Sequence, residues 1–223
     1  MNRALLAGIV AVTFLLAACG TSINSDIRIA DGEKRTGDLT TVNGRILLGT
    51  DSEVEGNCRT VNGDIRAEDG ASVGSLATVN GSIRGGERVV VAGDVESVNG
   101  SISLASDSRV AGEVSSINGG IDLKQTTVVG GLRTVHGNVN LRSGATVKGD
   151  VVFEKKIGSS WSQSRPLRIE IADGSVVEGD LIVEDRDLKV EVVLRGGGRV
   201  LGRIENASVI EDDTATDPER EAI

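Results

Sequence analysis

The sequence predicts an all-β protein, a single parallel β-helix of about nine coils built from repeats of 18 or 19 residues. Three observations support this. A short motif recurs at a nearly fixed period, which is typical of solenoid proteins. Aliphatic residues alternate with polar ones within each copy, as in strands. Only 1% of the residues are aromatic and 30 are glycine, so the interior must be built from thin layers of Val, Ile, Leu and Ala.

The first half of the repeat is clearest in Val98-Asn99-Gly100-Ser101-Ile102. With one copy per coil, the asparagines should lie one above another, and each side-chain amide can donate to one neighbour and accept from the other. Asparagine also tolerates the left-handed backbone of a tight corner, and the following glycine relaxes it further. We therefore predict a structural ladder of Asn24, Asn43, Asn62, Asn80, Asn99 and Asn118.

The second half of the repeat is a glycine, a variable residue and an aliphatic residue, and it occurs nine times. The first six intervals between copies are 18 or 19 residues, and the last two are 30 and 23. We therefore expect the β-helix to occupy residues 23–210, with two or three short strands per coil and a loop inserted at 152–166. Handedness and cross-section stay open at this stage. The copies begin at Gly37, Gly56, Gly74, Gly93, Gly112, Gly130, Gly149, Gly179 and Gly202.

The inserted loop is the candidate contact site, because long loops on a rigid scaffold often carry function. It contains Phe153 and the only tryptophan, Trp161. The alternative is that both side chains fold back over the last coils. Beyond the repeats, residues 211–223 carry six acidic side chains and are expected to form a disordered acidic tail.

The N-terminus has the features of an export signal: Arg3, a mostly apolar run and then small residues. Leu16-Ala17-Ala18-Cys19 resembles the bacterial lipobox. This resemblance implies a cleaved signal peptide at 1–18, palmitate-type acylation of Cys19, and a lipid anchor with a short linker at 19–22. Gly20, in place of an aspartate, favours the outer membrane of a bacterial cell envelope, on its periplasmic or its surface face.

The charge of the chain excludes one class of partner. The formal net charge is −9, whereas nucleic-acid binding needs basic stripes or aromatic platforms. The expected partners are the membrane, through the N-terminal lipid, and an envelope protein or polysaccharide that the sequence does not identify.

We expect no catalytic residue, cofactor or metal. His136 replaces asparagine in the seventh copy and has no second histidine to share a ligand site. Cys58 occupies an aliphatic position of the repeat and should be a small core residue. Asp38, Asp94 and Asp150 belong to an acidic column. Stacked carboxylates could attract calcium, but we expect a solvated acidic stripe.

Two resemblances to known families follow from these repeats. Val147-Lys148-Gly149-Asp150-Val151 resembles the repeats of bactofilins, the polymer-forming bacterial cytoskeletal proteins, and the Val-Asn-Gly-x-Ile element resembles repeats of adhesin-type envelope proteins. The bactofilin resemblance implies short coils that join end to end, without enzyme activity. However, bactofilins act on the cytoplasmic side, whereas Cys19 directs this chain outward, and the anchor should hinder stacking at the N-terminal face. Self-association therefore stays open.

The sequence thus predicts a non-enzymatic, membrane-anchored envelope lipoprotein acting as a rigid structural or adhesin-like binding scaffold. A bactofilin-like polymer is the first alternative. A β-helical polysaccharide-active enzyme is the second, and it is disfavoured because the longer coils and aromatic subsites typical of such enzymes are missing from the sequence.

Overall fold

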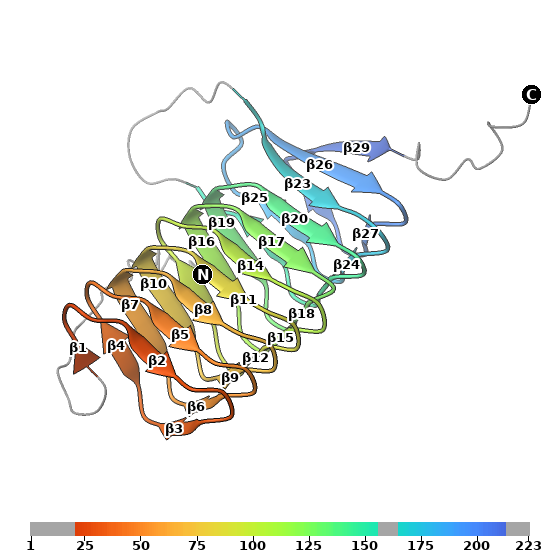
Figure 1. Ribbon diagram of the computed structural model, residues 1–223. Coiled ribbons are helices and arrows are strands. Elements are labelled where there is room, and N and C mark those ends of the chain that lie inside the picture. The colour runs from red at the N-terminus through yellow and green to blue at the C-terminus, as the bar shows by residue number, and fades with distance from the viewer. Residues whose placement is uncertain (1–20, 156–164, 213–223) are drawn as a thin grey trace, which may run out of the picture.

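Three parallel β-sheets wind around one aliphatic core in the computed structural model, which describes residues 21–155 and 165–212 (Figure 1). Each coil contributes one strand to each sheet in turn, so the cross-section, which the sequence left open, is three-sided. The predicted all-β solenoid of about nine coils is confirmed. Among the described residues there is no helix of the length and apolarity that crossing a bilayer requires.

The strands of the first sheet are β1 Thr21–Ser22, β4 Leu39–Thr41, β7 Cys58–Asn62, β10 Leu76–Asn80, β13 Val95–Ser97, β16 Val114–Asn118, β19 Leu132–His136, β22 Val151–Phe153, β25 Leu181–Val183 and β28 Ile204–Glu205. Those of the second sheet are β2 Ile27–Ile29, β5 Ile46–Leu48, β8 Ile65–Ala67, β11 Ile83–Gly85, β14 Ile102–Leu104, β17 Ile121–Lys124, β20 Val139–Arg142, β23 Leu167–Ile171, β26 Val190–Arg195 and β29 Ser208–Asp212. Those of the third sheet are β3 Lys34–Thr36, β6 Glu53–Glu55, β9 Ser72–Val73, β12 Val90–Val91, β15 Arg109–Val110, β18 Thr127–Val128, β21 Thr146–Val147, β24 Val176–Val177 and β27 Arg199–Val200.

The repeat sets the register between coils. Leu76 lies opposite Cys58 on one side and Val95 on the other, so equivalent residues of successive repeats are direct neighbours. Strand alternation sends every second side chain inward, and Ile46, Leu76, Ile102 and Val110 are all fully buried. The core is therefore a stack of near-identical aliphatic layers.

Both ends of the helix differ from the boundaries predicted from the sequence. Thr21 and Ser22, expected in a linker, form β1 and pair with Thr40 and Thr41. At the other end Glu211 and Asp212, expected in a disordered tail, belong to β29. Backbone pairing explains both errors. A strand at the end of a parallel stack is held mainly by hydrogen bonds to the neighbouring strand, so it can form without aliphatic side chains that mark it in the sequence.

The insertion also begins later than predicted. Val152 and Phe153 are part of β22, and Phe153 lies opposite Thr134 of the preceding coil, fully buried. The extra residues fall between β22 and β23, where Val139 pairs with Ile169 across 30 positions. A second, shorter insertion lies between β25 and β26 and accounts for the interval of 23.

Candidate binding surfaces of the rod

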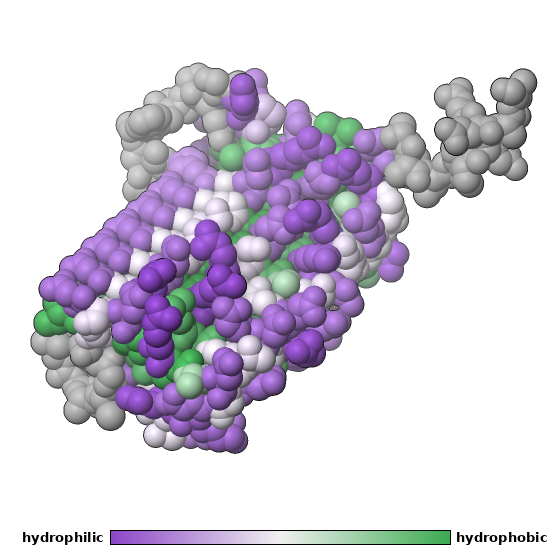
Figure 2. Space-filling view, viewed as in Figure 1, coloured by the Kyte–Doolittle hydropathy of each residue, from purple (hydrophilic) through white to green (hydrophobic). Residues whose placement is uncertain are grey.

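The six predicted asparagines form one continuous ladder. Each Nδ2 from Asn43 onward donates to the Oδ1 of the asparagine in the preceding coil, at 2.8–2.9 Å. All the bonds point in the same direction along the rod. The ladder follows the corner between the first and second sheets, where Figure 2 shows regular rows of hydrophilic residues beside β7 and β10.

The glycines after these asparagines are required by close stacking, and the predicted left-handed corner is wrong. A Cβ atom at Gly63 would lie 1.9 Å from the carbonyl oxygen of Gly44, and one at Gly100 would lie 1.9 Å from that of Gly81. None of the six ladder asparagines has a positive φ, and most non-glycine residues that do, for example Asp51 at 53°, belong to the corner between the second and third sheets. Asparagine is therefore selected here for its side-chain amide and glycine for its lack of a Cβ atom.

His136 continues the column beyond the last asparagine. It lies at the end of β19, directly opposite Asn118, and is half-buried. Its place in the register is that of a further ladder position. The described residues contain no group of three or more His, Cys, Asp or Glu side chains arranged to hold a metal ion.

A column of buried hydroxyls beneath the ladder was missed by the sequence analysis. Thr60 donates to the carbonyl of Gly44 at 2.9 Å, and Ser97 donates to that of Gly81 at 3.1 Å. The signal was present as a Thr or Ser two residues after the inward residue that begins each first-sheet strand from β4 to β19, as in Leu39-Thr40-Thr41. Every hydroxyl of the column except that of Thr134 donates to the ladder corner of the preceding coil and so ties two coils together. Other members are Thr41, Thr78, Ser116 and Thr134.

The acidic column is exposed to solvent at Asp38, Asp94 and Asp150, as expected for a solvated stripe, and its carboxylates also accept hydrogen bonds from the next coil. Oδ1 of Asp38 accepts the backbone N–H of Asn57 at 2.8 Å, and Oδ1 of Asp94 accepts that of Glu113 at 2.9 Å. Asp180 accepts both the backbone N–H and the guanidinium of Arg203, which lowers the pKa of its carboxyl. These contacts favour a structural role over a catalytic one.

A row of partly exposed aliphatic side chains lies beside the ladder on the first sheet. We call it the aliphatic ridge. Successive members of the ridge lie in coils that are bonded directly to each other. The backbone N–H of Asn62 donates to the carbonyl of Val42 at 2.7 Å, and that of Asn99 donates to the carbonyl of Val79 at 2.8 Å. Ile23 is 63% exposed and Ile117 36%, and the others are half-buried. The members are Ile23, Val42, Val61, Val79, Val98, Ile117 and Val135.

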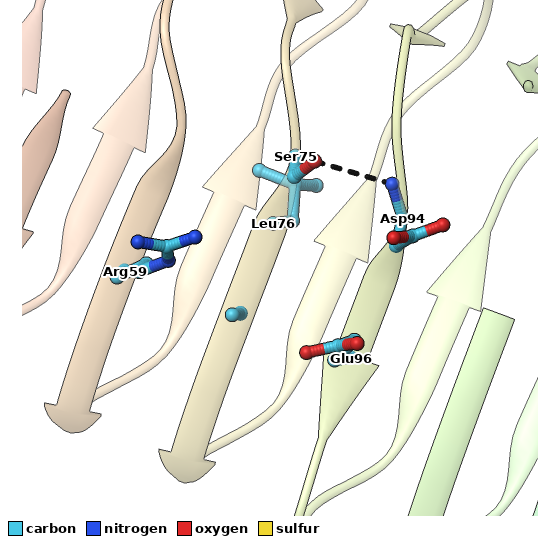
Figure 3. Close-up of a pocket in the computed structure, with 6 residues that line it drawn as sticks. Arg59, Ser75, Leu76, Asp94 and Glu96 are labelled. Carbon is cyan, nitrogen blue, oxygen red and sulfur yellow. Dashed lines mark hydrogen bonds between the residues drawn. The ribbon is translucent and has the colours of Figure 1, made fainter. Parts of the chain in front are cut away.

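A shallow notch interrupts the first sheet next to the ridge. Ala77 lies between two longer side chains, Arg59 and Glu96, which flank the strand in Figure 3. The notch holds about 110 Å³, well below the roughly 300 Å³ at which small-molecule pockets begin. Burial raises the pKa of Glu96, nearby Asp94 adds to this, and Arg59 opposes it. The notch has room for one side chain of a larger partner.

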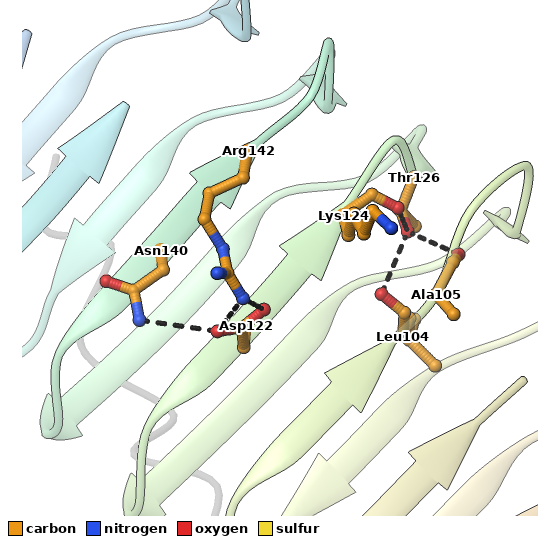
Figure 4. A network of polar contacts seen from close by, with 7 residues as sticks. All are labelled: Leu104, Ala105, Asp122, Lys124, Thr126, Asn140 and Arg142. Carbon is orange, nitrogen blue, oxygen red and sulfur yellow. Dashed lines mark hydrogen bonds and ion pairs between the residues drawn. The ribbon is translucent and has the colours of Figure 1, made fainter. Parts of the chain in front are cut away.

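The second sheet carries polar contacts that hold coils together. Nη2 of Arg142 lies 2.6 and 2.7 Å from the two carboxylate oxygens of Asp122 on the neighbouring strand (Figure 4). The Thr126 hydroxyl, at the adjoining corner, lies 3.1 Å from the carbonyl of Ala105 in the preceding coil. Because these side chains pair with one another, this face is a weaker candidate for binding than the ridge.

The remaining candidates from the sequence divide into two groups. Phe153 is an inward residue of β22, buried in the core, so it is neither a surface contact nor part of the inserted loop. Cys58 is fully buried and lies between Leu39 and Leu76, which raises the pKa of its thiol to about 12. Cys19 and Trp161 lie outside the described residues.

Comparison of the chain with protein-family models, with curated proteins and with solved structures finds no match.

Proposed function

We propose that this protein is a non-enzymatic, membrane-anchored lipoprotein of the bacterial envelope, a rigid scaffold that binds an extended partner along its aliphatic ridge. The observation that carries the binding proposal is the ridge itself. Seven aliphatic residues lie in successive coils on a fixed backbone, and an exposed row of apolar side chains in a soluble domain commonly marks an interaction site. The neighbouring amide ladder and the notch at Ala77 add polar groups that can set specificity.

The anchoring proposal rests on the lipobox-like segment that ends at Cys19. It is supported by the early start of the β-helix, since β1 begins at Thr21 and only Gly20 separates it from the cysteine. One residue spans at most about 3.6 Å. The first coil would then lie against the headgroups, with the ridge running away from the membrane.

Fractionation of cells that produce the full chain tests the anchor. The wild type should incorporate labelled palmitate and sediment with membranes, and Cys19→Ala should do neither. Cys58→Ala is the matched control and should behave as wild type, because that thiol is buried. Equal palmitate labelling of Cys19→Ala would refute lipidation at this residue.

Site-specific photo-crosslinking tests the ridge. A photoreactive residue at Val98 or at Trp161 should give a discrete adduct in cells, whereas one at Ser103, on the exposed face of the second sheet, should not. Loss of the Val98 adduct in a Val79→Asp variant, with the fold retained, would assign it to the ridge. Adducts of equal yield at Val98 and Ser103 would contradict a binding face.

A polymer-forming scaffold is the second candidate, and the C-terminal end of the rod favours it. Inward residues of the last coil are incompletely covered, with Val209 46% exposed, whereas Val192 beside it in the preceding coil is fully buried. Among the described strands, β27, β28 and β29 each have only one neighbour. Such an end can accept further strands.

A further inference from the structure

All five Asn-Gly steps of this chain belong to the ladder: Asn43-Gly44, Asn62-Gly63, Asn80-Gly81, Asn99-Gly100 and Asn118-Gly119. This dipeptide is chemically fragile, because a glycine offers no side chain to hinder attack by its own backbone nitrogen on Cγ of the preceding asparagine. A C–N bond forms to give a succinimide, the amide C–N bond breaks, and the proton of the attacking N–H leaves with the amide as ammonia. Water then opens the ring to aspartate or isoaspartate.

In the five coils that carry this step, both residues have a structural role. A Cβ atom at Gly81 would lie 2.1 Å from the carbonyl oxygen of Gly63, so a larger residue does not fit there. The asparagine in turn supplies both a donor and an acceptor to the coils on either side. This chain therefore carries a fragile bond in five successive coils.

Inner asparagines of the ladder are held at both ends of the amide. Asn80 donates from Nδ2 to Asn62 and accepts at Oδ1 from Asn99, at 2.8 and 2.9 Å. Attack on Cγ requires the amide to turn and Nδ2 to leave, and both changes break these bonds. The neighbouring coils thus oppose the reaction.

We propose that the ladder protects the Asn-Gly steps from deamidation, and that this protection is directional, so that conversion of one asparagine exposes the asparagine before it but not the one after it. The direction follows from the uniform orientation of the bonds. Aspartate at position 80 can still accept from Nδ2 of Asn99. It cannot donate to Oδ1 of Asn62, and its carboxylate repels that oxygen. Damage should therefore spread toward the N-terminus.

Peptide mapping by mass spectrometry on the folded full chain tests this, with aspartate and isoaspartate counted at each site over time. Asn80→Asp should speed deamidation of Asn62 by roughly two- to tenfold, the equilibrium equivalent of one neutral hydrogen bond, and leave Asn99 at the wild-type rate. Asn80→Ala removes both bonds and should speed deamidation of Asn62 and Asn99 alike. Asn57→Asp, outside the ladder, is the control and should leave all sites unchanged.

Three outcomes would overturn the proposal. The first is deamidation of the folded wild type as fast as that of the chain in urea, since the ladder would then protect nothing. The second is acceleration at Asn99 rather than Asn62 in Asn80→Asp. The third is a uniform increase at every site in that variant, because general loosening of the coils, not a directional ladder, would explain it.

Discussion

At the scale of single residues, the buried hydroxyls show that the contribution of a side chain depends on its partner. Thr60 and Thr134 occupy equivalent positions in the first sheet, and both are nearly inaccessible to solvent. The Thr60 hydroxyl donates to the carbonyl of Gly44, whereas the Thr134 hydroxyl has no hydrogen-bond partner among the described residues. Phe153, which follows Thr134 in the column, marks the coil where the regular pattern ends.

This difference predicts opposite effects of the same substitution. Thr60→Val should lower the free energy of unfolding by roughly 0.5–1.5 kcal/mol, because one hydrogen bond is lost. Thr134→Val should leave it unchanged or raise it, because a buried unpaired hydroxyl is removed. Thermal or urea unfolding of the two variants measures both effects. Equal losses in both variants would show that the Thr134 hydroxyl is paired in solution.

Cys58 gives a pH-dependent prediction. Burial raises the pKa of its thiol from the ordinary 9.0 to about 12 in the folded chain. Because the pKa is raised by folding, the stability contribution is complete below pH 9 and is lost as the pH rises toward 12. The stability of the wild type should therefore fall over this range, and Cys58→Val, which matches the aliphatic neighbours, should fall less. An identical fall in both would assign the loss to other groups.

A thiol reagent at neutral pH should label Cys58 only after unfolding.

At the scale of elements, each inner asparagine of the ladder stabilises the fold through hydrogen bonds to the coils on both sides. Asn99 has two ladder bonds and Asn24 has one. Asn99→Ala should therefore lower the melting temperature more than Asn24→Ala, with a loss of roughly 1–3 kcal/mol for the two bonds together. Calorimetry of both variants is the direct comparison, and unchanged melting of Asn99→Ala would mean that the exposed amides bond equally well to water.

How far the sequence predicts these elements depends on what holds each one. The ladder was predictable because a periodic side chain is visible in the sequence. The role of Gly63 was predicted wrongly, because a glycine needed where two backbones lie close together looks the same in the sequence as a glycine needed in a turn. β1 and β29 were missed because strands at the ends of the stack are held mainly by backbone bonds to their neighbours. The ridge at Val98 was visible as a repeated valine but could not be placed outside the core until the three-sided cross-section was known.

At the scale of the whole molecule, the two ends of the rod are chemically different. The first coil places the exposed Arg35 where later coils bury Val54 and Val73, so a charged residue takes the place of an aliphatic one at that end of the third sheet. Strand edges are free at both ends of the described rod, but the last coil also leaves the inward-facing Val209 partly exposed. A solenoid is stabilised by the interfaces between neighbouring coils. A terminal coil whose aliphatic side chains are exposed is therefore the least stable coil and the one most prone to associate with another chain.

This asymmetry predicts that association begins at the C-terminal end. Sedimentation of a chain starting at Gly20 should show mass that increases with concentration, because paired ends bury both the aliphatic side chains and the free strand edges. Val209→Lys should shift the distribution to monomer by placing a charge in the contact, and Ser103→Lys, in the middle of the second sheet, should not. A monomer at every concentration for the unmodified chain would remove the support for a polymer-forming scaffold and leave the ridge as the main binding surface.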